Sequence, residues 1–388
     1  MKRKTWIFIC TVTILCGLLS VPCAAQENTK PNSITEGIIQ VIDELDFKGV
    51  QDIEVNGEAG NQTIRDTVLQ FANGKYFSVE ATVFSVVDSF IEALSGLGKL
   101  MLGIMLPVVL SSMMTCTFVS TQSGTNALAR NVSFMLMLIP IISAVIGELE
   151  HARQTITIMT ERMDQLLPML LTLLTALGGN ASTAFFHPVV VAASGSMVFL
   201  AREVILRMVM CTCAVTAVNH LSDSVHLSRM AQLLRSCVCW LLGVSFTVFL
   251  GAMSLQGVCS ASIDGVAIRA AKYAVDNFVP IVGGMFSDTM DTLVGCTLIV
   301  KNALGVTSAI VLLSTVLAPM MRTVAVVFVM KLSAALLEPV ARTEMIRTIV
   351  DFSRTIVLFL VTMLCVSTMY FLLIVQLLLV GNLTVLLR

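Results

Sequence analysis

The chain has 388 residues, of which 56% are hydrophobic and only 13% are charged, and its mean hydropathy is +0.90. A soluble domain normally carries about a quarter of charged residues, so this composition excludes one and predicts an all-α, polytopic integral membrane protein. The net charge is −1 and no basic patch with interleaved aromatic residues occurs, so the expected surroundings are the lipid bilayer and not nucleic acid.

Residues 1–25 have the pattern of a secretory signal peptide, because a basic start is followed by an apolar run and then by small residues before Gln26. Cleavage would leave the mature N-terminus outside the cytoplasm, and the alternative is an uncleaved anchor helix. Residues 26–78 are polar and too few to enclose a large core. We expect them to form a small extracytoplasmic arm that is helical or partly disordered.

Residues 79–388 are expected to form the polytopic membrane domain. The spacing of apolar residues over 77–99 predicts an amphipathic helix at the membrane surface. Two uncharged runs, 100–129 and 131–147, are each long enough for one crossing, which takes about 17 to 20 apolar residues. The segment 148–164 is charged and polar, which assigns it to the outer face.

Residues 276–305 interrupt an apolar sequence with polar groups and helix breakers. Proline removes a backbone donor and glycine costs about 1 kcal/mol of helix propensity, so a broken or re-entrant segment is predicted here. Ionisable residues at membrane depth usually face protein or water, which makes the segment a candidate functional region. Its candidate positions are Asp276, Asn277, Pro280, Gly283, Gly284, Asp288, Asp291, Lys301 and Asn302.

An earlier segment has the same organisation. In both segments an aspartate lies four residues before a proline. A glycine pair, an apolar helix with charges in its second part and a polar loop then follow. This similarity predicts an internal duplication, residues 152–257 and 265–380, unless proline-kinked apolar helices resemble one another through composition alone. The first unit adds five candidate positions. They are Asp164, Pro168, Arg202, Glu203 and Arg207.

The number of crossings, from about six to eight, depends on these two proline segments. If both are re-entrant, there are six crossings, the repeats are parallel, and the loops 219–235 and 338–354 lie together in the cytoplasm. The arginines of these loops favour this arrangement. If the proline segments cross fully, there are about eight crossings and the repeats are inverted.

No catalytic triad, H-E-x-x-H motif or G-x-x-x-x-G-K-[ST] motif supports an enzyme, so no catalytic residue, cofactor or metal ligand is assigned. A loop with two histidines is flanked by two pairs of cysteines, Cys211 with Cys213 and Cys237 with Cys239. The four cysteines would bind one metal ion only if both pairs faced that ion. The alternative is that they pack as small hydrophobic residues.

With enzymatic motifs absent from the sequence, the remaining candidate chemistry is that of polar and charged residues inside the membrane. The carboxylates of Asp164, Asp276, Asp288 and Asp291 would bind or relay cations, or else cap helices near the interface. Glu203 is expected to pair with Arg207 at i+4. Small residues along 283–305 would let helices approach closely, within one chain or in a homo-oligomer.

Several runs have a distinctive sequence: 228–235, 249–257, 264–272, 276–291, 301–305 and 337–339. Together they resemble the stage III sporulation protein AE family of endospore-forming bacteria over roughly residues 90–380. The resemblance implies a multipass protein of the mother-cell membrane around the forespore. It would work with other membrane proteins of its operon, a partner ATPase and a forespore membrane protein in a channel or secretion-like complex.

A non-enzymatic component of that complex is therefore the leading interpretation. The alternative is an independent secondary transporter that uses the intramembrane carboxylates. An intramembrane enzyme is a third class, but no nucleophile and base pair supports it.

Overall fold

The structure is a computed structural model that describes residues 54–57, 60–63, 79–117, 123–177, 180–221, 227–278 and 283–386. The predicted signal peptide and most of the predicted arm lie outside the described residues. The helices are α4 Val79–Gly96, α5 Gly98–Thr117, α6 Ser123–Ala176, α7 Asn180–Phe199, the π-helix η2 Leu200–Ile205, α8 Leu206–Leu221, α9 Ser228–Phe278, α10 Gly283–Leu337 and α11 Thr343–Leu386. The predicted helical membrane bundle is thereby confirmed.

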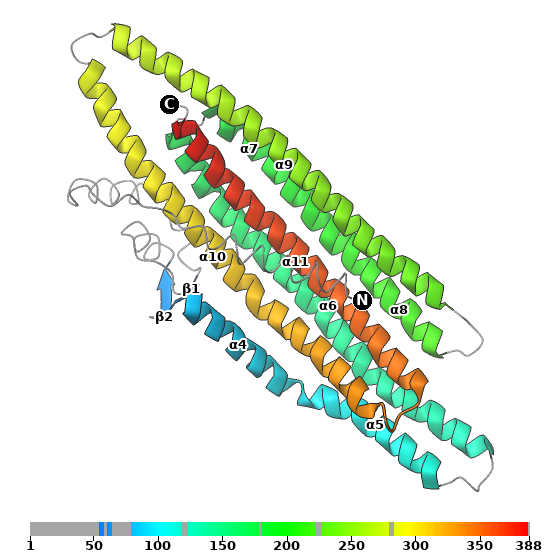
Figure 1. Cartoon of the computed structure of the whole chain (residues 1–388). Coiled ribbons are helices and arrows are strands. Elements are labelled where there is room, and N and C mark those ends of the chain that lie inside the picture. The colour runs from blue at the N-terminus through cyan, green and yellow to red at the C-terminus, as the bar shows by residue number, and fades with distance from the viewer. Residues whose placement is uncertain are drawn as a thin grey trace.

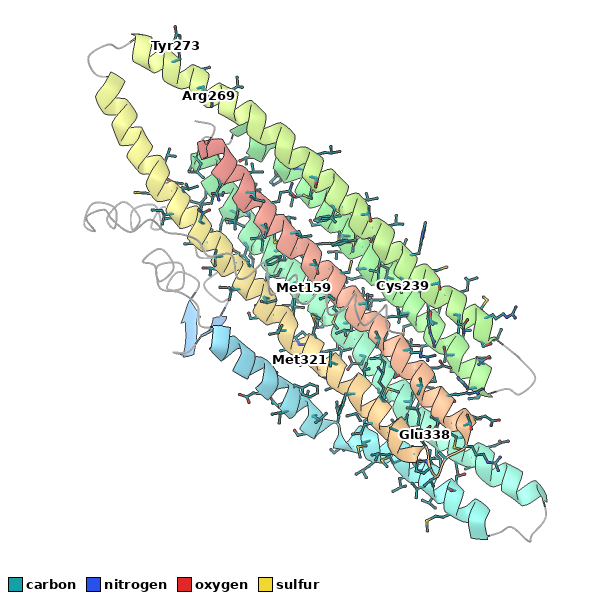
Figure 2. The ribbon with its side chains drawn as sticks, viewed as in Figure 1. Met159, Cys239, Arg269, Tyr273, Met321 and Glu338 are labelled. Atoms are coloured by element: carbon teal, nitrogen blue, oxygen red, sulfur yellow. The ribbon has the colours of Figure 1, made fainter. Side chains whose placement is uncertain are left out.

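The long helices lie side by side and alternate in direction (Figure 1). We call one end of the bundle the Glu338 end; α5, α8 and α10 end there, and α6, α9 and α11 begin there (Figure 2). The opposite end is the Tyr273 end. Because α8 and α10 both finish at the Glu338 end, the two predicted units run in parallel, and the inverted alternative is wrong. Their origin by duplication stays a prediction.

Five described helical stretches are long and apolar enough to cross a membrane, and a sixth arises if the bent pair Asp88–Gly96 and Gly98–Met113 is one span. This number agrees with the six predicted crossings. The helices are much longer than a crossing requires. The 55 residues of α10 extend about 80 Å at 1.5 Å per residue, whereas the hydrocarbon core is about 30 Å thick.

The placement of residues 148–164 in an outer loop is wrong, because they lie inside α6. Ala152, Ile156, Met159 and Met163 are buried at helical spacing and continue the apolar face through the charged segment. The charges therefore occupy one side of a continuous helix, and they do not end it.

Pro168 does not interrupt the helix, contrary to the sequence prediction. It lies inside α6, which ends at Ala176, and the hydroxyl of Thr172 donates a hydrogen bond to the Pro168 carbonyl at 2.8 Å. Leu167 and Leu170 are buried on either side of it, so packing holds the helix together despite the missing backbone donor.

The second predicted break is found, but the segment is not re-entrant. α9 ends at Phe278 and α10 begins at Gly283. The two helices then run in opposite directions from the Tyr273 end (Figure 1). α9 and α10 therefore form a long helical hairpin, and residues 279–282 between them lie outside the described residues.

α11 is the central helix of the bundle and packs against α6, α8, α9 and α10. Ile356, Phe359 and Met363 on it are fully buried. Large apolar side chains are instead exposed on α5 and α9, including Leu102 and Leu106 on α5 and Val248 on α9. An exposed apolar surface of this extent suits a helix that faces lipid.

The described part of the arm is a β-hairpin. β1 (Glu54–Gly57) pairs antiparallel with β2 (Gly60–Thr63), and Glu54 lies opposite Thr63. The hairpin lies beside α10 (Figure 1). The sequence predicted a helical or partly disordered segment, whereas the described residues of the arm form two paired strands.

Candidate functional site

The structure separates the predicted positions into three groups. Asp276 and Asn277 lie at the end of α9, and Gly283, Gly284, Asp288 and Asp291 lie at the start of α10, all at the Tyr273 end; Pro280 and all these side chains lie outside the described residues. Lys301 and Asn302 are further along α10. The third group is the remainder, Asp164 and Pro168 on α6 and Arg202, Glu203 and Arg207 on η2 and α8, and within it a contact is found between Glu203 and Arg207.

Lys301 is fully buried where α10 packs on α11. Its Nζ donates a hydrogen bond to the main-chain carbonyl of Leu378 at 2.9 Å. No described carboxylate lies within ion-pair distance of this ammonium group, which has three donors to satisfy. The side-chain oxygen of Asn302 is also buried without a hydrogen-bond partner. A buried lysine without a counter-ion is rare, so packing alone does not explain it.

Two glycines allow α10 and α11 to approach each other at Lys301. A Cβ on Gly381 would overlap the Nζ and Cε of Lys301, and a Cβ on Gly305 would overlap the side chain of Leu378. Lys301 and Gly305 are one turn apart on α10, so they present one face to Leu378. The close helix approach expected from small residues is thus found at Gly305, within one chain.

A network of charges joins α8, α9 and α11 near the Glu338 end. Asp351 on α11 lies 3.3 Å from Nε2 of His220, 3.6 Å from Nη1 of Arg235 and 3.2 Å from Nη1 of Arg354. Arg235 also donates to the main-chain carbonyl of Asp351 at 3.0 Å and to the hydroxyl of Thr355 at 3.3 Å. One carboxylate therefore holds together side chains from three helices.

The π-helix η2 contains Arg202 and Glu203, and π-helical turns are frequent at functional sites. Glu203 accepts a hydrogen bond from Arg207 one turn later, which confirms the predicted i+4 pair. Its other oxygen lies 3.9 Å from Nη2 of Arg153 on α6. The Nε of Arg202 is buried without a partner. This charged group therefore lies where η2 meets the helix that carries Asp164.

Polar contacts also join α6 to α10 and α11 inside the bundle. The hydroxyl of Thr323 donates to the buried carboxylate of Glu148 at 2.6 Å, and Arg162 donates to Thr315. Tyr370 on α11 donates to Thr160 at 3.2 Å. These contacts fix the register of α6 against its neighbours.

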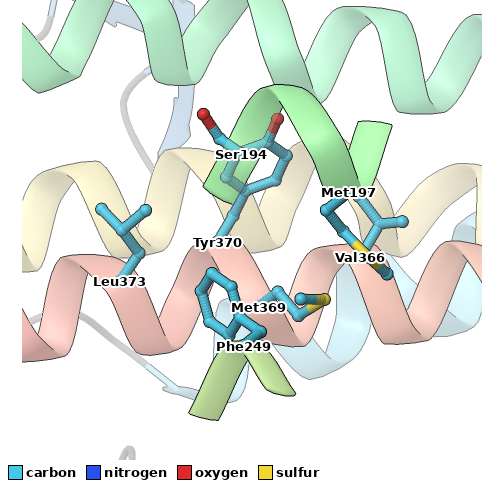
Figure 3. Close-up of a pocket in the computed structure, with 7 residues that line it drawn as sticks. All are labelled: Ser194, Met197, Phe249, Val366, Met369, Tyr370 and Leu373. Atoms are coloured by element: carbon cyan, nitrogen blue, oxygen red, sulfur yellow. The ribbon is translucent and has the colours of Figure 1, made fainter. Parts of the chain in front are cut away.

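One pocket among the described residues is small and apolar. It lies between α7, α9 and α11 and is lined by Ser194, Met197, Phe249, Val366, Met369, Tyr370 and Leu373 (Figure 3). Its volume of about 10 Å³ is near the least that holds one water molecule, so it is not a substrate site. Within the described residues no group of three or more metal-ligand side chains occurs, and His226, beside the cysteines of α8 and α9 in sequence, lies outside these residues.

The sequence profile described as Stage III sporulation protein AE matches residues 62–381, which is most of the chain. The chain belongs to the stage III sporulation protein AE family. It is also 26% identical to the stage III sporulation protein AE of Bacillus subtilis (strain 168), over the full length of both chains. No solved structure gives a match. Membership of this family supports a role in sporulation for this membrane protein.

Sequence reasoning missed Asp351 as the centre of a site in this stage III sporulation protein AE family member. From the sequence, Arg235 and Arg354 are assigned no more than a place among the arginines of the loops 219–235 and 338–354. A usable signal was present, because Asp351 and Arg354 are one helical turn apart. Their contact with His220 and Arg235 depends on how three helices pack, which the sequence does not specify.

Replacing Lys301 by methionine should leave the protein at least as stable while impairing sporulation. Methionine has a similar volume, and removing an unpaired buried charge should raise the free energy of unfolding by about 1 to 3 kcal/mol. Thermal unfolding in detergent and heat-resistant spore counts in a complemented deletion strain would measure the two effects. The matched control is Lys331→Met, an exposed lysine on the same helix. Normal spore counts in Lys301→Met would show that the charge has no role.

Proposed function

We propose that this protein is a non-enzymatic membrane component of a channel or secretion-like complex between the mother cell and the forespore. The single observation that carries the proposal is the family match over residues 62–381. Two further features support it: a bundle with up to six crossings and the lack of a nucleotide-binding motif in the sequence. The protein therefore depends on a partner ATPase for energy.

The location in the mother-cell membrane around the forespore belongs to the same proposal. Arg229, Arg235, Arg342, Arg347 and Arg354 gather near the Glu338 end, so the positive-inside rule assigns that end to the mother-cell cytoplasm. The partner ATPase is then expected at the Glu338 end. The Tyr273 end would face the space between the two membranes, where a forespore membrane protein is accessible.

The proposal predicts that a deletion strain stops development after the forespore has been engulfed. Complementation with the full chain should restore a forespore reporter expressed after engulfment, together with heat-resistant spores. An affinity-tagged chain should copurify with the ATPase from sporulating cells. A deletion strain with normal spore counts would refute the proposal.

The alternative, an independent secondary transporter, is favoured by the exposed carboxylates of Glu161 and Asp164 on α6. It predicts that the purified chain alone transports a solute into liposomes under an ion gradient. A component of a complex should show no such transport until its partners are added.

A further inference from the structure

One side of α6 carries exposed side chains that are all polar. The exposed residues of this helix between 150 and 165 are Glu150, Arg153, Gln154, Glu161, Asp164 and Gln165, and all six are polar. We call them the polar stripe. They cover about 22 Å along the helix at 1.5 Å per residue. The opposite face of the same turns is apolar and buried in the bundle.

The depth of the polar stripe follows from Tyr370 on α11. Tyr370 donates a hydrogen bond to Thr160 of α6, and it lines the small apolar pocket together with Phe249 of α9 (Figure 3). Thr160 and Phe249 therefore lie at the same level of the bundle. At this level the exposed side chains of α9 include Val248 and Leu250, within a sequence that has no charge from 236 to 263.

The two sides of the bundle thus differ at one depth. The α9 side has the apolar surface that lipid tails require, whereas the α6 side presents Glu161 beside Thr160, and Asp164 one turn later. Ionised side chains at this depth are costly against lipid and face protein or water instead. Because the polar stripe is exposed on a single chain, something other than lipid must cover it.

The polar stripe continues onto the neighbouring helix. Arg153 lies 3.9 Å from Glu203 on η2, and Glu203 pairs with Arg207 on α8. The exposed fractions of the three side chains are 45%, 29% and 71%, so these ion pairs do not remove the charges from the surface. The polar surface is therefore wider than one helix.

We propose that the polar stripe lines a water-filled passage through the membrane, enclosed between copies of this chain. The described part of one chain does not enclose the passage, since the polar stripe lies on its outer surface. Glu150, Glu161 and Asp164 outnumber Arg153, so the passage favours hydrated cations and neutral polar solutes over anions. The inference deepens the proposed channel function and rests on it for the physiological role, but its test is independent of sporulation.

The test is cysteine labelling in membranes of sporulating cells that contain the whole complex. Single cysteines replace Gln154, Glu161 or Gln165 in a chain whose eleven native cysteines are alanine or serine. The matched controls are Val248→Cys and Leu250→Cys on α9. A charged, membrane-impermeant thiol reagent should label the three positions of the polar stripe at least about tenfold faster than the controls.

Two labelling results would overturn the inference. Labelling of the polar stripe only by a lipid-soluble maleimide would mean that it faces lipid. Labelling by neither reagent would mean that it packs against protein without water. If the cysteine-free chain does not accumulate, the same substitutions are made in the parent chain, and labelling of the parent is the baseline.

A second measurement tests whether copies of the chain enclose the passage. A short bifunctional thiol reagent should join two Gln154→Cys chains into a covalent dimer, whereas Val248→Cys chains should remain monomers. A labelled polar stripe without the dimer would overturn enclosure by copies. If the polar stripe labels as expected but the deletion strain sporulates normally, the passage stands and the proposed function fails.

Discussion

A Gly305→Ala variant should unfold in detergent at a lower temperature than the parent, whereas Gly295→Ala should unfold at a higher one. Both glycines lie inside α10. Nothing lies within 4 Å of a Cβ at Gly295, but a Cβ at Gly305 would overlap the side chain of Leu378 on α11. The addition of one methyl group to α10 is therefore expected to lower the unfolding temperature at position 305 and to raise it at position 295.

The expected magnitudes follow from two opposing contributions. Alanine is favoured over glycine inside a helix by about 1 kcal/mol, which is the whole effect at Gly295. At Gly305 this gain is outweighed by overpacking, which costs about 1 to 3 kcal/mol on its own and more if α10 and α11 are forced apart. The net loss is larger if Lys301 also loses its hydrogen bond to the Leu378 carbonyl.

A compensating substitution keeps this prediction falsifiable. Leu378→Ala removes the atoms that a Cβ at Gly305 would meet, so Gly305→Ala should cost much less in that background than in the parent. Equal costs in the two backgrounds would show that Leu378 is not what restricts position 305. A stabilising effect of Gly305→Ala in the parent would contradict the close approach itself.

The structural features that could be predicted correctly from the sequence are those that depend on the composition of a single segment. The uncharged run of α11 after Arg354 and the apolar content of α9 and α10 require helices that satisfy their own backbone in lipid, so the helical bundle and six crossings could be expected. The interruption predicted within 276–305 was also found, since α9 ends at Phe278 and α10 begins at Gly283. The parallel order of the two units followed from the arginines of two loops.

The features that the sequence could not provide depend on contacts between helices. Pro168 and the charges of 148–164 looked like breaks, but the buried face of α6 overrides both. Of the candidate positions, Lys301 was placed in a buried interface and Arg202, Glu203 and Arg207 were brought beside α6. No local pattern shows that Glu148 meets Thr323 or that Asp351 meets Arg235, because these residues are far apart along the chain.

Replacing Asp351 by asparagine should destabilise the packing of α8 and α9 on α11 more than removal of any exposed arginine. The side chains of Arg235 and His220 are only 17% and 14% exposed, and Asp351 is the described carboxylate that both contact. Asparagine keeps the shape but leaves these basic groups without an opposite charge. Removing one member of a buried pair costs about 3 to 5 kcal/mol.

The cost at Asp351 should be about 2 kcal/mol, below that range, for two reasons. The Asp351 side chain is 29% exposed, so water already weakens its attraction to the arginines. The hydrogen bond from Arg235 to the main-chain carbonyl of Asp351, at 3.0 Å, survives the substitution. The measurement is the free energy of unfolding in detergent, compared with Arg354→Gln, whose 57% exposed side chain should cost less than about 1 kcal/mol.

A double-mutant cycle decides whether Arg235 and Asp351 act together. Arg235→Gln should be costly in the parent, but it should cost little once Asp351→Asn is present, because the carboxylate it would leave unpaired has already gone. Additive losses would mean that the two residues stabilise the bundle separately and that their proximity is incidental. A coupled pair would instead mean that one carboxylate fixes α9 to the central helix at the Glu338 end, through a contact that only the folded bundle creates.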